Sequence, residues 1–361
     1  MILDPFCGSG SVLAEALILG RNAIGIDINP LAIMISRAKT SPIAPSYLAP
    51  VMDEVLRNVE RNVRLNREKK YEPEVFYFKN IYHWFNKQVI NDLSIIKESI
   101  EKTRVHDKSI QNLLKVCFSA TMLKTSNIAF ADNPYFARAK TAEALKKHAP
   151  DVPEVFKTNV NNYIERMTVF YEMLPCGVSC RVLEHDSRNI PLEDGSIDLI
   201  VTSPPYGEES HTMSYTRFTK LSLLWLGYSP RDINRSNSRS LGGTLAAFRD
   251  ISPSLDKLYH KLVHKEKQRA REVFSFFWDY KKSIDEMYRV LDHGGLACIV
   301  IGDRSALGMK VSNGEITEEL AKLAGFSHKA TYHRKIPKKV LPRSDYKVDL
   351  INEENIVVLE K

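Results

Sequence analysis

The first forty residues alternate between short apolar runs and stretches with helical periodicity. Residues 1–10 start as an apolar strand and run into a Gly-Ser-Gly turn, and residues 11–19 have helical spacing up to Gly20. Residues 23–28 are again an apolar strand, and Asn29-Pro30 opens a second helix, since proline is favoured in a first helical turn. This strand–helix–strand unit predicts a parallel sheet.

Residues 50–175 form a long, charged stretch without this alternation, in which the spacing of apolar residues is mostly helical. We therefore predict a helical insertion over residues 41–177, with target recognition as one role that it could serve. The aromatic residues near its middle are expected to pack in its core rather than to stack on bases: Phe76, Tyr77, Phe78, Tyr82, Trp84 and Phe85.

The α/β pattern resumes at residue 178. Strands are predicted at 179–184, 197–201 and 296–301, helices at 272–291 and 316–323, and a closing antiparallel hairpin from 327–335 and 356–360. Residues 207–271 show little periodicity and are rich in Ser, Arg and Lys, which predicts a basic loop region. The predicted fold class is α/β, a doubly wound sheet built discontinuously from residues 1–40 and 178–361.

Composition narrows the class of protein. The 361 residues are 43% hydrophobic and 26% charged, ordinary globular values that exclude disordered and fibrous chains. Mean hydropathy is −0.26, and neither a membrane-spanning run nor a secretion signal is visible. The five cysteines form no disulfide or metal pattern, so we expect a reducing, cytoplasmic location and no metal. The net charge of +7 weakly favours a polyanionic partner.

The first motif that carries chemistry is Asp4-Pro5-Phe6-Cys7-Gly8-Ser9-Gly10, between the first strand and the first helix. Glycines there let the backbone approach a ligand closely, and the helix N-terminus offers free N–H groups. Asp27 ends the next strand, where an acid can accept hydrogen bonds from ribose hydroxyls. The alternative is a tight turn with a capped helix.

The second motif is Thr202-Ser203-Pro204-Pro205-Tyr206, directly after an apolar strand. Two prolines fix the backbone and remove N–H donors, which leaves carbonyl acceptors beside a hydroxyl and an aromatic ring. Such a loop suits a planar heterocycle that carries an amino group: Ser203 and a proline carbonyl accept from the amine, and Tyr206 stacks on the ring. A proline-braced strand exit is the alternative interpretation.

Together the two motifs resemble those of the amino-methylating, S-adenosylmethionine-dependent DNA methyltransferases, whose catalytic core has a Rossmann-like class I fold. The Ser form of the tetrad looks like the cytosine-N4 branch, whereas adenine-N6 enzymes more often carry Asp or Asn. The resemblance covers residues 1–40 and 178–361 and does not explain residues 41–177. The family has a further motif upstream of the glycine loop. Three alternatives stay open for it: another segment substitutes, a partner chain supplies it, or the start of the sequence is truncated.

The resemblance also implies roles for individual residues. Asp4, Phe6, Gly8 and Gly10 match the loop that holds the methionine end of the cofactor. Asp27 matches the ribose-binding acid, Ile28 lies beside the adenine, and Asp186 matches the acid that contacts the adenine amine. The catalytic tetrad is Ser203, Pro204, Pro205 and Tyr206. The implied partners are duplex DNA, from which the target base is flipped, and a cognate restriction endonuclease, with which the family is often paired.

Basic residues that follow the tetrad, together with one asparagine, are candidates for contact with the DNA backbone or bases. We single out Arg231, Arg235, Asn237, Arg239 and Arg249. Three other functions stay open: adenine-N6 methylation of DNA, guanine-N2 methylation of RNA, and a DNA-binding subunit without catalysis. A solvated loop is the alternative to DNA contact.

Overall fold

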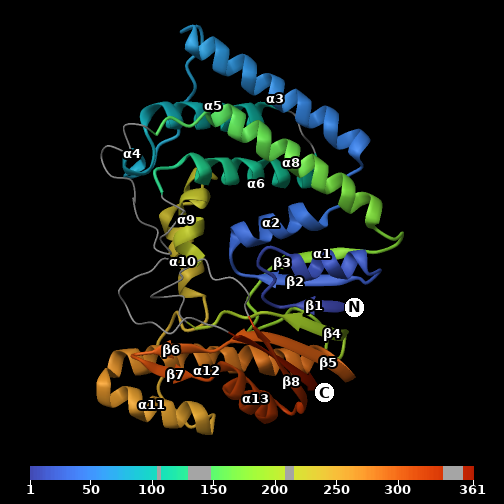
Figure 1. The fold of residues 1–361 in the computed structure, drawn as a ribbon, viewed down its shortest axis with the longest axis vertical. Helices are drawn as coiled ribbons and strands as arrows, with labels where there is room; N and C mark the ends of the chain where they lie inside the picture. Colours follow the sequence, from blue (N-terminus) through green and yellow to red (C-terminus); the bar gives the residue numbers. More distant parts are fainter. Residues whose placement is uncertain (104–106, 129–147, 208–214, 336–352) are drawn as a thin grey trace.

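The computed structural model describes residues 1–103, 107–128, 148–207, 215–335 and 353–361. Its centre is a seven-stranded sheet in the order β3-β2-β1-β4-β5-β9-β8 (Figure 1). Strands β3, β2, β1, β4 and β5 are parallel, and β9 pairs antiparallel with both β5 and β8. The bounds are β1 Ile2–Asp4, β2 Ala23–Asp27, β3 Cys180–Glu184, β4 Ile197–Thr202, β5 Leu291–Gly302, β8 Ser327–Lys335 and β9 Glu353–Glu360.

Helices cover both faces of this sheet, as a doubly wound fold requires. One face carries α1 (Ser11–Ile18) and α2 (Pro30–Thr40); the other carries α12 (Lys267–Val290) and α13 (Asn313–Ala324) (Figure 1). The Asn29 side chain accepts a hydrogen bond from Leu31 N, so α2 begins where the sequence predicts. A two-stranded ribbon, β6 (Arg304–Ala306) and β7 (Met309–Val311), lies outside the sheet. The α/β prediction and the closing hairpin are confirmed.

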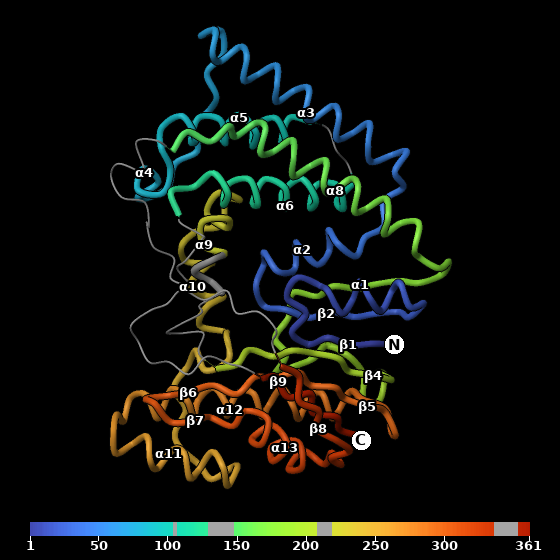
Figure 2. Tube along the Cα trace, in the orientation of Figure 1, coloured from blue at the N-terminus to red at the C-terminus, as the bar shows by residue number. Residues whose placement is uncertain are grey.

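The inserted segment is helical, as predicted. Its described helices are α3 Pro45–Arg67, α4 Ile81–Trp84, α5 Lys87–Lys102, α6 Lys108–Thr125 and α8 Val152–Met173. Helix α6 packs on α2, so the inserted helices form a further layer over that face of the molecule (Figure 2). None of the described helices is long and apolar enough to cross a membrane.

The core of this helical layer is centred on Trp225, which comes from outside the insertion. Ring centroids of Phe76, Phe78, Phe85 and Phe118 lie 5.6 to 6.0 Å from the Trp225 ring. The prediction that the aromatic cluster forms core therefore holds for most of its members, with Trp84 packed at the margin. It is wrong for Tyr77 and Tyr82, whose side chains are exposed.

The expected basic loop over residues 207–271 is wrong in its secondary structure. The described part contains α9 (Tyr215–Trp225), α10 (Pro230–Ser238) and α11 (Pro253–Lys265), and α12 already begins at Lys267. Ser229 and Ser252 cap α10 and α11, each followed by a proline in the first turn. On α10 only Ile233 is buried, so the helix has no row of apolar residues from which its sequence could be read as a helix.

Candidate functional site

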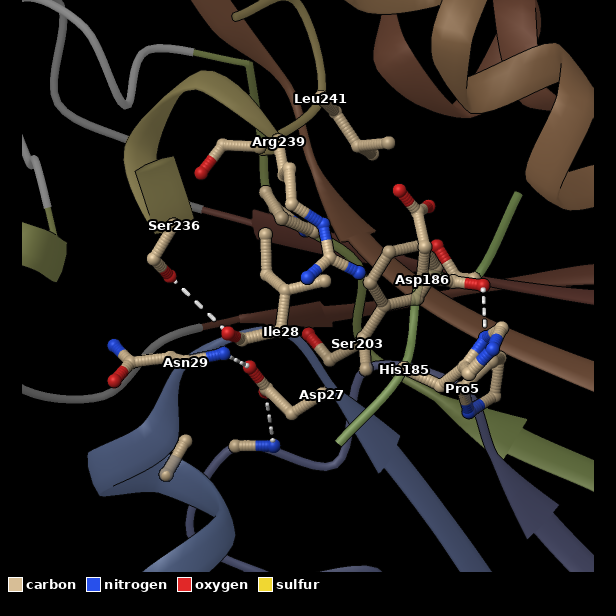
Figure 3. A pocket seen from close by; sticks show the side chains of 16 residues that line it. Pro5, Asp27, Ile28, Asn29, His185, Asp186, Ser203, Ser236, Arg239 and Leu241 are labelled. Carbon is tan, nitrogen blue, oxygen red and sulfur yellow. Dashed lines mark hydrogen bonds between the residues drawn. The ribbon is translucent and has the colours of Figure 1, made fainter. Parts of the chain in front are cut away.

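A cavity of about 220 Å³ opens at the carboxyl ends of the parallel strands. Strand β1 pairs with β2 on one side and with β4 on the other, so the order in which strands are added to the sheet reverses at β1. Ligands of open α/β sheets bind at such a switch point. The lining (Figure 3) consists of Pro5, Phe6, Gly8, Asp27, Ile28, Asn29, Ala32, His185, Asp186, Ser187, Ser203, Pro205, Ser236, Arg239, Ser240 and Leu241. The glycine loop and the diproline loop thus share one cavity.

The glycine loop is shaped by two left-handed residues, Gly8 (φ 47°) and Gly10 (φ 73°). A Cβ atom on Gly10 would lie 2.8 Å from Ser36 Oγ, so only glycine fits there. Ser36 Oγ in turn donates to the Gly8 carbonyl oxygen at 2.8 Å. Phe6 and Gly8 line the cavity, whereas Gly10 lies against α2 and starts α1.

Asp27 ends β2 and faces the cavity (Figure 3). Its carboxylate accepts from Gly8 N at 3.0 Å and from Asn29 N at 2.8 Å. Burial raises the pKa of Asp27 against the effect of these backbone donors. Ionised Asp27 has about four lone-pair sites, so acceptor capacity remains for a ligand's hydroxyl groups.

Asp186 follows β3 and is held by Arg188. Arg188 Nε donates to Asp186 Oδ1 at 2.9 Å, and Nη2 donates to Oδ2 at 2.7 Å. Burial opposes ionisation of this carboxyl, but the hydrogen bonds and charge of Arg188 outweigh it and lower the pKa of Asp186 below its ordinary value. Asp186 is therefore an oriented acceptor at the wall of the cavity. His185, beside it, also lines the cavity.

The tetrad is only partly at the cavity surface. Ser203 is exposed and Pro205 half-buried, and both line the cavity, whereas Pro204 is buried. Tyr206 is half-buried outside the lining, and its Oη donates to Glu354 Oε1 at 3.0 Å. Asn313 Nδ2 donates to the Tyr206 carbonyl oxygen at 3.1 Å, so the end of the tetrad is tied to β9 and α13.

Two residues of the glycine motif lie beneath the cavity rather than in its lining. Asp4 is 3% exposed and accepts from Thr202 Oγ1 at 2.6 Å and from Phe6 N at 3.1 Å. Burial raises the pKa of Asp4 to about 7. Asp4 therefore supports the glycine loop from below and is not among the residues that line the cavity. Burial also raises the pKa of the Cys7 thiol, so it is a poor nucleophile.

Four of the five residues proposed for DNA contact lie on α10 or at its C-terminal cap, and only Arg249 lies outside this segment. Arg231 and Arg235 are exposed on α10. Arg249 is also exposed, and its guanidinium carbon lies 5.1 Å from the centroid of the Trp278 ring. The amide oxygen of Asn237 is buried and has no hydrogen-bond partner among the described residues, which does not suit reading a base edge. Arg239, which we expect to read bases, is exposed and lines the cavity.

The sequence prediction missed several lining residues. His185 and Asn29 could have been found, because each follows the end of a parallel strand, where ligands bind. Ser236, Ser240 and Leu241 had no such signal, since they reach the cavity only through the packing of α10. In the described part of the chain, no cluster of three or more His, Cys, Asp or Glu residues could hold a metal ion.

Comparisons with known proteins agree with the motifs. A model of the DNA methylase family matches residues 1–37. The type II methyltransferase M.MvaI of Kocuria varians is 30% identical over 375 aligned positions, which cover 99% of this chain and 82% of that protein. M.BsoBI of Geobacillus stearothermophilus, also a type II methyltransferase, is 24% identical over 285 positions, 72% of this chain and 53% of that protein.

Among solved structures, similarity is low. An S-adenosylmethionine-dependent methyltransferase of Methanosarcina mazei has a TM-score of 0.33 and 10% identity, covering 100% of this chain and 91% of its own. The rRNA methyltransferase aviRa of Streptomyces viridochromogenes has a TM-score of 0.30 and 11% identity, covering 99% of this chain and 75% of its own.

Proposed function

Because this chain belongs to the DNA methylase family, whose members use S-adenosylmethionine, we propose that it methylates the N4 amine of cytosine at a specific sequence in duplex DNA. The observation that carries the proposal is the single cavity lined by Ser203 and Pro205 of the tetrad together with Gly8 and Asp27. The Ser form of the tetrad favours cytosine over adenine. Duplex DNA as the substrate is supported by the likeness to two type II methyltransferases.

The residues that line the cavity fit the cofactor. Asp27 keeps acceptor sites for two ribose hydroxyls after binding Gly8 N and Asn29 N, and the oriented Asp186 carboxylate can accept from the adenine amine. The glycine loop lets the backbone at Gly8 approach the methionine end closely. When bound, the cofactor supplies an electrophilic methyl group on a sulfonium.

The chain's part in the reaction is to orient the amine. The lone pair of an aromatic amine is delocalised into the ring, which makes the nitrogen a poor nucleophile. Hydrogen bonds from the two N–H groups to Ser203 Oγ and the Pro204 carbonyl oxygen would localise that pair on the nitrogen. The nitrogen would then attack the methyl carbon in line while the bond between that carbon and sulfur breaks and a neutral thioether leaves. The methylated amine would lose one proton to water, with positioning supplying much of the rate. The base must leave the DNA stack to reach Ser203.

The test is mass analysis of nucleosides from a long unmethylated phage DNA, which contains every short sequence, after incubation with the full chain and labelled cofactor. We expect labelled N4-methylcytosine, formed at least about 100-fold more slowly by the Ser203→Ala variant. Labelled N6-methyladenine would overturn the assignment of the base. Labelling of transfer RNA but not DNA would overturn the substrate class.

A further inference from the structure

The end of α10 and the turn after it form one wall of the cavity. Ser236, Arg239, Ser240 and Leu241 line it, on the side of Ile28 and Asn29 (Figure 3). Ser236 Oγ donates to the Ile28 carbonyl oxygen at 3.1 Å, so the helix end is anchored directly on the end of β2. This wall is independent of the two motifs, because it comes from a helix that neither motif contains.

Arg188 also holds the backbone of this wall, on the side away from the contact between Ser236 and Ile28. Its Nη2 atom donates to the Arg239 carbonyl oxygen at 2.8 Å while also binding Asp186. Its Nη1 atom lies 2.7 Å from Asp279 Oδ2, and that same oxygen accepts from Gly242 N at 3.1 Å. The backbone is therefore held on both sides of the segment from Arg239 to Gly242. The Arg188 and Asp279 side chains are only 21% and 7% exposed, so water competes little for these contacts.

The Arg239 side chain has no partner of its own in the described residues. Its guanidinium group makes no hydrogen bond or ion pair there, and Figure 3 shows it pointing into the cavity between Ile28 and Asp186. Its charge contributes to the lowered pKa of Asp186, after the larger effects of burial and Arg188. A planar cation beside an apolar side chain and an oriented acceptor suits a flat, electron-rich ring.

We infer that Arg239 is a cofactor-binding residue whose guanidinium stacks on the adenine ring, and that Arg188 is the positioning residue that holds it there. The inference rests on the proposed function only in taking S-adenosylmethionine as the ligand. Ile28, Asp186 and Gly8 all line the cavity. In the proposed binding mode of the cofactor, Ile28 and Asp186 lie on the adenine side and the glycine loop at Gly8 lies on the methionine side. Arg239 lies on the adenine side, so recognition of the methionine carboxylate is the competing role.

The test measures binding of two ligands to the full chain by calorimetry, without DNA. S-adenosylmethionine has both ends, and 5′-methylthioadenosine lacks the amino-acid end. Arg239→Ala should weaken the binding of both ligands by the same factor, about 5-fold, the upper value for a cation–π contact of an exposed side chain. The contacts to Arg188 survive this change because they use the Arg239 backbone carbonyl. Arg181→Ala, which removes an equal charge from the exposed side of β3, should leave both affinities within two-fold.

Each other outcome is decisive. Weaker binding of S-adenosylmethionine alone would place Arg239 on the carboxylate and overturn the adenine assignment, and unchanged binding of both ligands would overturn cofactor contact altogether. Arg188→Lys, which cannot keep all three partners, should weaken 5′-methylthioadenosine binding less in the Arg239→Ala background than in the wild type. Equal losses in both backgrounds would overturn the positioning role. A wild-type chain that binds both ligands but methylates adenine would overturn the proposed function alone.

Discussion

Thr202 Oγ1 donates a 2.6 Å hydrogen bond to Asp4 Oδ1, which joins the ends of two neighbouring strands that are 198 residues apart in the sequence. Both side chains are buried, and each directly precedes a loop that lines the cavity. Phe6 N donates to the same oxygen of Asp4. One buried carboxyl group therefore sets the glycine loop and the diproline loop relative to each other.

Asp4 should make the stability of the protein fall as pH rises. Its pKa is raised from 3.8 to about 7 by burial, so the folded state keeps a proton that the unfolded chain loses between these values. The contribution of Asp4 to the free energy of unfolding is therefore fully present below about pH 4 and is lost as the pH rises to about 7. Asp4→Asn keeps an acceptor for Thr202 and Phe6 and cannot ionise, so this decline should disappear.

The measurement is the free energy of unfolding in denaturant at pH 5 and pH 8. From pH 5 to pH 8, the free energy of unfolding of Asp4→Asn should rise relative to that of the wild type by up to about 3 kcal/mol. The reason is that each pKa unit corresponds to about 1.4 kcal/mol. Asp53→Asn, an exposed change on α3, serves as the control. A difference between Asp4→Asn and wild type that is the same at both pH values would contradict the prediction.

Ser203→Ala should separate chemistry from cofactor binding. Ser203 is an acceptor for the target amine in the proposed mechanism and is exposed at the cavity, so its loss should not disturb the fold. We expect methyl transfer to fall at least about 100-fold, as for the loss of one oriented polar group at a reacting centre. Binding of S-adenosylmethionine, measured by calorimetry, should stay nearly unchanged. Ser196→Ala, an exposed change just before β4, should leave both intact; parallel loss of both in Ser203→Ala would indicate misfolding.

Asp27→Ala, in contrast to Ser203→Ala, should weaken binding of the cofactor. Two ribose hydroxyls would lose a charged acceptor, and hydrogen bonds to charged groups contribute about 1.5–3 kcal/mol each. We expect the dissociation constant for S-adenosylmethionine to rise at least about 10-fold. Because Asp27 also binds Gly8 N and Asn29 N, the unfolding temperature is measured in parallel. An unchanged dissociation constant in a stably folded variant would remove Asp27 from the cofactor site.

The strands and the site at their ends were largely predictable because local rules determine them. Asn29 caps α2 and Pro30 occupies its first turn, and glycine is required at Gly10 by both its φ angle and its contact with Ser36. Such features depend on neighbours close in sequence, or on a strand end where ligands bind in this fold class. That is why the positions of Gly8 and Asp27 in the cavity were foreseen.

The position of Arg239 depends on how distant elements pack. Its charge and its place after the tetrad predict a DNA contact, whereas its place in the cavity lining follows from the anchoring of α10 on Ile28, which the sequence does not indicate. The helix itself was missed because Ile233 is its only buried residue. The capping pair Ser229 and Asp232 was the available signal for it, since each side chain binds the backbone N–H of the other.

Tyr206→Phe should test how far the tetrad depends on its tie to β9. The change removes the hydrogen bond to Glu354 but leaves the ring and the bond from Asn313 to the Tyr206 carbonyl. We expect a loss of about 1 kcal/mol in the free energy of unfolding, and methyl transfer within about 10-fold of wild type. Tyr206→Ala, which also removes the ring, should reduce kcat much further. If the two variants had the same kcat, the ring would have no part in holding the flipped base.

Arg231 and Arg235 are the two proposed DNA contacts that the structure leaves exposed on α10, and they are expected to neutralise phosphates rather than to read bases. Each phosphate contact contributes about −0.9 to the slope of log K against log salt concentration. The double variant Arg231→Gln/Arg235→Gln should therefore have a slope that is shallower by about 2. It should also bind specific and non-specific DNA more weakly by similar factors. The measurement is duplex binding between about 50 and 200 mM salt.

A second double variant, Arg57→Gln/Arg61→Gln on the exposed side of α3, removes the same net charge and should leave the slope near its wild-type value. Equal slopes for the two double variants would show that α10 does not contact the DNA backbone, and would direct the search to another face of the molecule.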